Sequence, residues 1–168
     1  MFVKNVITKL LVVVLFSLFY SCSSVHSMND FYNKYEDKAT IVPIPNFALK
    51  WANMATGGSS IYNYLKSAKV FVLKDASKNT QQKVFKDLSS STKGDNFTKL
   101  VHLNKSKNNL DVYVLEGETN IERLVFGVNG FDNVLIIDSK LNIKKDLLEN
   151  LLESINTEDI EFIKEILN

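Results

Sequence analysis

The chain has 168 residues, which is enough for one domain and little more. Apolar residues make up 45% of it and charged residues 23%, a balance that supports a packed core and excludes disorder over the whole length. The formal charge is only +1 and Arg123 is the single arginine. Composition therefore disfavours nucleic-acid binding, which needs a strong positive field, and recognition of phosphates by arginine clusters.

The first 21 residues have the pattern of a signal peptide. Lys4 and Lys9 precede an apolar run, residues 10–20, that is interrupted only by one serine. This run is shorter than the roughly 20 residues that span a bilayer, and it has the length of a signal-peptide core. We expect cleavage after Ser21, which would leave 18 basic and 19 acidic residues and a net charge of −1.

Cys22 directly follows this run, as the modified cysteine of a lipoprotein does. Its thiol would carry a diacylglycerol, and the new amino terminus could carry a further acyl chain. About two or three palmitate-like chains hold a protein on a membrane almost permanently. We predict that residues 22–27 form a lipidated tether and that the domain lies in the cell envelope, on the outer membrane facing the periplasm. Two alternatives stay open, secretion with Cys22 as an incidental thiol and an uncleaved anchor, and both also place the domain outside the cytoplasm.

Cys22 is also the only cysteine in the chain. The domain therefore has no internal disulfide, no cysteine nucleophile and no thiolate metal site.

The first half of the mature chain mixes helices and strands. Apolar residues at helical spacing predict helices over residues 28–35, from Phe47 to Met54, and briefly over residues 61–68. Residues 39–44 are extended, and Pro43 makes them an edge strand because proline cannot donate to a ladder.

Residues 70–73 then form a compact apolar run that predicts a buried central strand. A helix is predicted over residues 79–89, and the polar residues 89–96 predict a loop.

The second half changes to strands at spacings of about ten residues. Asn129-Gly130, between the last two, predicts a hairpin with a type I′ turn. The end is helical, with leucines from Leu147 to Leu152 after Asn142 as N-cap, and a second helix over residues 157–168. The four predicted strands are residues 97–103, 110–115, 121–128 and 134–138.

These elements predict a single α+β domain over residues 28–168, with a mostly antiparallel sheet, a C-terminal four-strand meander, and helices packed on one face. The aromatic opening helix (Phe31-Tyr32-Asn33-Lys34-Tyr35) and the closing strands 124–128 and 134–138, followed by Leu141-Asn142-Ile143, resemble the small exported bacterial proteins of domain of unknown function 4252. The resemblance covers residues 28–153. It implies an envelope location and a compact α+β fold, and it lends no reaction, cofactor or catalytic residue.

His102 offers the best lead for catalysis. It lies between two apolar residues on a predicted strand, and Asp111 is expected on the neighbouring strand, where a carboxylate would orient the imidazole. The alternative is a half-covered histidine on a sheet face. His26 lies in the tether, where an idle histidine is the simpler interpretation.

Several other patterns have simpler structural explanations. Gly57-Gly58-Ser59-Ser60 resembles part of an anion-binding loop but lacks the lysine of a P-loop, so a helix connector fits better. Glu116 and Glu118 share one turn, where solvated charge is the default, and Asp132 and Asp138 flank the last strand. Four aromatic residues would line a groove or, more simply, build core: Phe47, Trp51, Tyr62 and Tyr113.

The sequence predicts no catalytic, cofactor-binding or metal-binding residues, and only Cys22 as a lipid attachment site. The main hypothesis is a non-catalytic envelope protein that binds a partner protein, a peptide or a small apolar ligand at an edge strand or groove. The alternative is a small envelope hydrolase that uses His102 with a nearby carboxylate.

Overall fold

The computed structural model describes residues 25–55, 64–105, 108–130 and 132–147. Six antiparallel strands form one sheet in the order β1-β2-β6-β5-β4-β3. The strands are β1 (Thr40–Ile44), β2 (Leu65–Leu73), β3 (Thr98–Lys105), β4 (Asn108–Glu116), β5 (Asn120–Gly130) and β6 (Asn133–Lys144). The α+β class and the C-terminal meander β3-β4-β5-β6 are confirmed.

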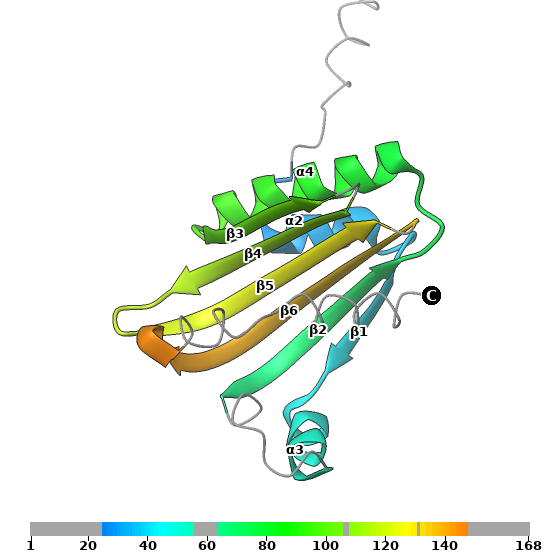
Figure 1. Cartoon of the computed structure of the whole chain (residues 1–168). Coiled ribbons are helices and arrows are strands. Elements are labelled where there is room, and N and C mark those ends of the chain that lie inside the picture. The colour runs from blue at the N-terminus through cyan, green and yellow to red at the C-terminus, as the bar shows by residue number, and fades with distance from the viewer. Residues whose placement is uncertain (1–24, 56–63, 106–107, 131, 148–168) are drawn as a thin grey trace, which may run out of the picture.

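Within the described residues, three helices accompany the sheet: α2 (Met28–Tyr35), α3 (Asn46–Ala55) and α4 (Lys78–Gly94). Figure 1 shows α2 and α4 across one face of the sheet and α3 at the far end of β1 and β2. The predicted arrangement, with helices packed on one face, is confirmed for α2 and α4.

Local sequence explains where α2 begins. The Ser27 hydroxyl caps the helix by accepting a hydrogen bond from the backbone N–H of Asp30 at 3.1 Å. The buried side of the helix carries Phe31 and Tyr35 toward the sheet. Val25, which precedes the cap, is 5% exposed, so the predicted tether 22–27 already contains a residue of the core.

The main core lies between these helices and the sheet. Phe31 of α2 and Phe71 of β2 are fully buried, with ring centroids 5.3 Å apart, and Leu88 of α4 packs into the same cluster. The prediction that Pro43 marks an edge strand is confirmed, because β1 is the first strand of the sheet.

The end of α4 was predicted wrongly. Residues 89–94 continue the helix instead of forming a loop. Ser91 and Thr92 are fully buried, and both hydroxyls donate to the carbonyl of Leu88 at 2.8 Å. Because both hydroxyls find their acceptor within the helix, Ser91 and Thr92 can be buried as apolar residues are. The helix ends at Gly94 with Asp95 as its C-cap, and Asn96 follows with a positive φ of 63°.

Two further predictions need correction. Residues 65–68 belong to β2 and not to a brief helix, and residues 56–63 lie outside the described residues. Asn142 is part of β6 and does not cap a helix; its N–H donates to the carbonyl of Tyr64 at 3.0 Å. A helical turn follows at residues 145–147, and the predicted helices beyond it lie outside the described residues.

Asn129 and Gly130 are the last two residues of β5, the first strand of the hairpin, and do not form its turn. Gly130 pairs with Asn133, so the chain reverses between these two residues, and Asp132 takes the positive φ of 60°. The predicted hairpin is therefore correct and its predicted turn position is wrong.

Candidate functional site

Polar side chains concentrate on the helix-covered face of the sheet. Strand register shows this, because residues paired across antiparallel strands point to the same face. Lys69 of β2 is opposite Asp138 of β6, and Tyr113 of β4 is opposite Lys99 of β3. Two polar clusters result, one near the β3 edge and one beneath α2.

The first cluster, which we call the His102 cluster, is centred on Asp111. His102 and Asp111 are directly opposite on β3 and β4, as the sequence suggested, and His102 Nδ1 lies 2.6 Å from Asp111 Oδ1. The second carboxylate oxygen accepts from Lys99 Nζ at 3.0 Å and from the Tyr113 hydroxyl at 2.8 Å. The cluster therefore comprises His102, Asp111, Lys99 and Tyr113.

Asp111 is held in its charged form. Burial alone would raise its pKa, but hydrogen bonds from His102, Lys99 and Tyr113 outweigh this and lower the pKa below its ordinary value. Burial raises the pKa of the Tyr113 hydroxyl, helped by its bond to Asp111, so this hydroxyl stays protonated and donates. The carboxylate is thus an acceptor shared by three donors.

This arrangement supplies one half of an acid–base device. A carboxylate on Nδ1 fixes the imidazole orientation and leaves Nε2 to exchange protons. The side chain of His102 is 56% exposed, so Nε2 is open to solvent. Among the described residues, however, no hydroxyl or thiol nucleophile is hydrogen-bonded to His102. The cluster therefore holds an oriented imidazole, and the described part of the chain places no hydroxyl or thiol nucleophile in contact with it.

The second cluster, which we call the Arg123 cluster, joins α2 to the sheet. Arg123 donates to Asp138 through Nε at 3.2 Å and through Nη2 at 2.7 Å, and the Tyr32 hydroxyl donates to Asp138 Oδ2 at 2.9 Å. Lys69 Nζ lies 3.9 Å from the centroid of the Tyr32 ring. Burial and the neighbouring carboxylate raise the pKa of Tyr32, and so its hydroxyl remains a donor.

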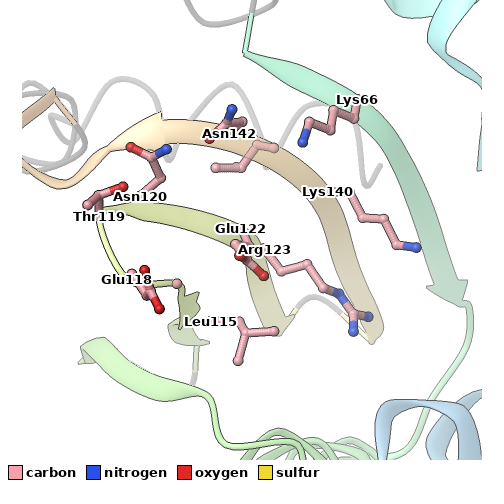
Figure 2. A pocket seen from close by; sticks show the side chains of 11 residues that line it. Lys66, Leu115, Glu118, Thr119, Asn120, Glu122, Arg123, Lys140 and Asn142 are labelled. Carbon is pink, nitrogen blue, oxygen red and sulfur yellow. The ribbon is translucent and has the colours of Figure 1, made fainter.

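Next to the Arg123 cluster, the sheet forms a hollow of about 770 Å³. Figure 2 shows it between β2, β5 and β6 and the turn that joins β4 to β5. Its lining is mostly polar. The side chains that line it come from Lys66, Leu115, Glu118, Thr119, Asn120, Glu122, Arg123, Lys140, Leu141 and Asn142.

The cations of this hollow differ in their partners. The Arg123 guanidinium is neutralised by Asp138, and hydrogen bonds and charge raise its pKa although burial opposes this. Lys66 and Lys140 make no ion pair with any residue that the structure describes. A second hollow of about 640 Å³ adjoins the first, because Arg123 and Lys140 line both.

Sequence reasoning missed this region. It noticed Arg123 only as the single arginine, and it placed Asp138 at the end of a strand, whereas Asp138 lies in the middle of β6 and is 5% exposed. The usable signal was a charged residue inside an otherwise apolar strand, which requires a partner when buried.

The remaining sequence candidates stay apart from both clusters. His26 is exposed, and its N–H donates to Asp30. Glu116 pairs with Lys145. Asp132 is exposed and precedes β6, and within the part of the chain described it makes no hydrogen bond or ion pair with Asp138.

The aromatic candidates differ in how far they are buried. Tyr113 is 2% exposed and belongs to the core, while Phe47 is 68% exposed. The side chain of Trp51 is not described, and Tyr62, residues 57–60 and Cys22 lie outside the described residues.

The described residues lack two kinds of feature. They contain no group of three or more histidine, cysteine, aspartate or glutamate side chains placed to hold a metal ion. They also contain no helix with the length and apolar character to cross a membrane.

Comparison with known proteins gives one match. No curated protein and no solved structure matches the chain. A family model described as "Domain of unknown function (DUF4252)" matches residues 32–157, which is most of the chain and includes both clusters and the hollow. The resemblance inferred from the sequence is thereby confirmed, and the chain belongs to the DUF4252 family.

Proposed function

We propose that this protein is exported, anchored to the outer membrane of a bacterial envelope through lipid on Cys22, and acts in the periplasm as a non-catalytic binding module. The observation that carries the binding role is the polar hollow beside the Arg123 cluster. A site of about 770 Å³ has the size of small-molecule sites in proteins.

The lining favours a small polar ligand with a negatively charged group. Lys66 and Lys140 supply ammonium groups that form no ion pair with a carboxylate of the described residues. Hydroxyl and amide groups come from Thr119, Asn120 and Asn142. This lining suits such a ligand better than the small apolar one that the sequence suggested. Glu118 and Glu122, which also line the hollow, would reject ligands with several negative charges.

Binding is tested by titrating the domain with gluconate, glucuronate and inorganic phosphate while following backbone amide NMR shifts. We expect saturable shifts that gather at residues 117–123 and 139–142 for at least one probe. Exchanging Lys66 and Lys140 for glutamine should weaken that binding about tenfold or more, because each lost charge-assisted bond is worth on the order of 1.5 kcal/mol. Lys86→Gln, on the exposed side of α4, is the matched control.

The binding proposal fails if the wild-type domain shows no saturable shift with any of the three probes. It also fails if Lys86→Gln weakens binding as much as the double variant does, because the effect would then report overall charge and not the hollow.

The anchor is tested separately. Cells that express the full chain and receive labelled palmitate should incorporate label into the wild type and into Ser23→Ala, but not into Cys22→Ala. Cys22→Ala should also leave the membrane fraction. A processed Cys22→Ala protein that still sediments with the outer membrane would contradict the lipid anchor and leave the binding proposal intact.

A hydrolase that uses His102 is the second candidate, and the 2.6 Å contact between His102 and Asp111 favours it. Substrate would bring the electrophile, and water would be the nucleophile, since the described residues offer none. His102→Ala should abolish such an activity in a screen of ester and amide substrates, whereas His26→Ala should not. Equal activity in wild type and His102→Ala would eliminate this candidate.

A further inference from the structure

The sheet face opposite α2 and α4, which we call the second face, is apolar from edge to edge. Strand pairing places one residue of each strand in a single row across it. Every member of this central row is apolar: Val42, Val70, Ile137, Phe126, Val112 and Val101.

The two flanking rows repeat the pattern with few exceptions. On one side the register aligns Thr40 with Val72, Leu135, Val128, Leu110 and Leu103. On the other side it aligns Ile44, Ala68, Ser139, Leu124, Val114 and Thr98. An antiparallel sheet with one side in water alternates apolar with polar residues, so two apolar faces indicate a sheet that is covered on both sides.

Exposure across the second face is graded. In the middle, Val112 is 2% exposed and Leu135 is 6% exposed, whereas at the two edges Val42 is 47% exposed and Leu103 is 49% exposed. The helices α2 and α4 do not account for burial in the middle, because they pack against the opposite face. The burial pattern is that of a cover narrower than the sheet.

The described chain ends on this face. After β6, the side chain of Leu147 packs against a cluster that includes Val114, Ile121 and Ile143. Val114 belongs to the second face, since it is paired with Leu124 in the row above. The residues after Leu147 therefore start from the second face.

The 21 residues that follow, 148–168, are suited to cover it. As helix they would reach roughly 31 Å, and six strands span about 24 Å at their usual spacing. Apolar residues recur at helical spacing in two stripes, and acidic residues lie on the other side of each. The stripes are Leu148, Leu151, Leu152 and Ile155, then Ile160, Ile163 and Leu167.

We propose that residues 148–168 dock as amphipathic helix across the second face, with Leu152 and Ile163 against the sheet and the glutamates toward water. Three observations select this occupant over a second copy or an apolar ligand. The segment starts on the face, it is long enough to cross the buried middle of the sheet, and its covalent link to β6 gives it an effective concentration that a free partner lacks. The match of the family model extends to residue 157, so the first stripe is part of the family domain.

The test is carried out on residues 23–168, which contain every described element and no cysteine. A spin label on Ser154→Cys should broaden the methyl resonances of Val70, Val112 and Ile137 on the second face much more than those of Val134 on the opposite face. Mixing labelled with isotope-enriched, unlabelled protein shows whether the effect is intermolecular. Broadening only in the mixture would assign the face to a second copy and overturn the proposal, as would no broadening of these methyls.

A pair of variants gives an independent readout. Leu152→Asp should raise the fluorescence of the apolar dye ANS about threefold or more, because it exposes the second face. Glu153→Gln, one residue away on the polar side of the segment, should leave the fluorescence unchanged. If the two variants bind the dye equally, the segment does not cover the sheet.

Discussion

The Arg123 cluster allows a sharp test of the packing between α2 and the sheet. Asp138 has 5% of its side chain exposed and accepts two hydrogen bonds from Arg123 and one from Tyr32. In Asp138→Ala, the guanidinium, itself only 23% exposed, loses its counter-charge, and the Tyr32 hydroxyl loses its acceptor. Removing one partner of a buried ion pair typically costs about 3–5 kcal/mol, because the other charge remains buried alone.

We therefore expect Asp138→Ala to lower the free energy of unfolding by about 4 kcal/mol. With a urea dependence of about 2 kcal/mol per molar, typical of a domain this size, the unfolding midpoint should fall by about 2 M. Asp37→Ala, at an exposed position after α2, should change the stability by less than about 0.5 kcal/mol.

A double variant separates loss of charge pairing from loss of packing. Arg123→Met with Asp138→Leu leaves no buried charge, and so it should be more stable than Asp138→Ala alone. If Asp138→Ala costs less than about 1 kcal/mol, the ion pair behaves as a surface pair and the placement of Asp138 beneath α2 is wrong.

Three further predictions concern the core, the N-terminal segment and pH. Phe71→Ala should cost about 3–5 kcal/mol in urea unfolding, because the ring is fully buried; a cost near zero would contradict the core. Replacing glycine by alanine normally stabilises a helix, but in Gly94→Ala the new Cβ would lie 1.8 Å from the carbonyl oxygen of His26. Hydrogen exchange of the backbone amides of residues 25–27 should therefore become faster, and unchanged protection of these amides would refute the contact. The pKa of Asp111 is lower in the folded than in the unfolded state, so its charged form contributes stability above the unfolded-state pKa of about 4. This stability is lost as pH falls through the folded-state pKa, and Asp111→Asn should therefore lose less stability in acid than the wild type does. An equally steep acid loss in that variant would show that other carboxylates determine it.

The fold could be predicted from the sequence wherever side-chain periodicity matched burial. The aromatic helix α2 and the meander were predicted from the spacing of their apolar residues, and β1 was predicted as an edge strand from Pro43. The end of α4 was missed for a physical reason. Ser91 and Thr92 are polar in composition, but their hydroxyls bond to the preceding helical turn, and so they are buried like apolar residues.

The Arg123 cluster could not be predicted, because the turn position inferred from Asn129-Gly130 gives the wrong register between β5 and β6. A two-residue turn at Asn129-Gly130 would place Arg123 opposite Ile136. The observed reversal between Gly130 and Asn133 shifts β6 by four residues and places Arg123 opposite Lys140, with Asp138 nearby. The face of each strand was still correct, because an even shift preserves which side chains point to the core.

The His102 cluster shows what the sequence could and could not supply. A short hairpin predicted that Asp111 would lie near His102, and the structure has the two opposite each other. It could not predict that Lys99 and Tyr113 also bond to Asp111, because a bulge between Lys99 and Val101 sets that alignment.

The strand order has a consequence for how the chain assembles. The last strand, β6, lies between β2 and β5, so it joins an N-terminal half to a C-terminal half that otherwise share no ladder. Neither half has a complete sheet until residues 133–144 have been synthesised, and such sequence-distant pairing is slow to form. A polypeptide that completes its sheet only when β6 pairs stays unfolded until those residues are available, and an unfolded chain is the form that can be threaded through a narrow passage.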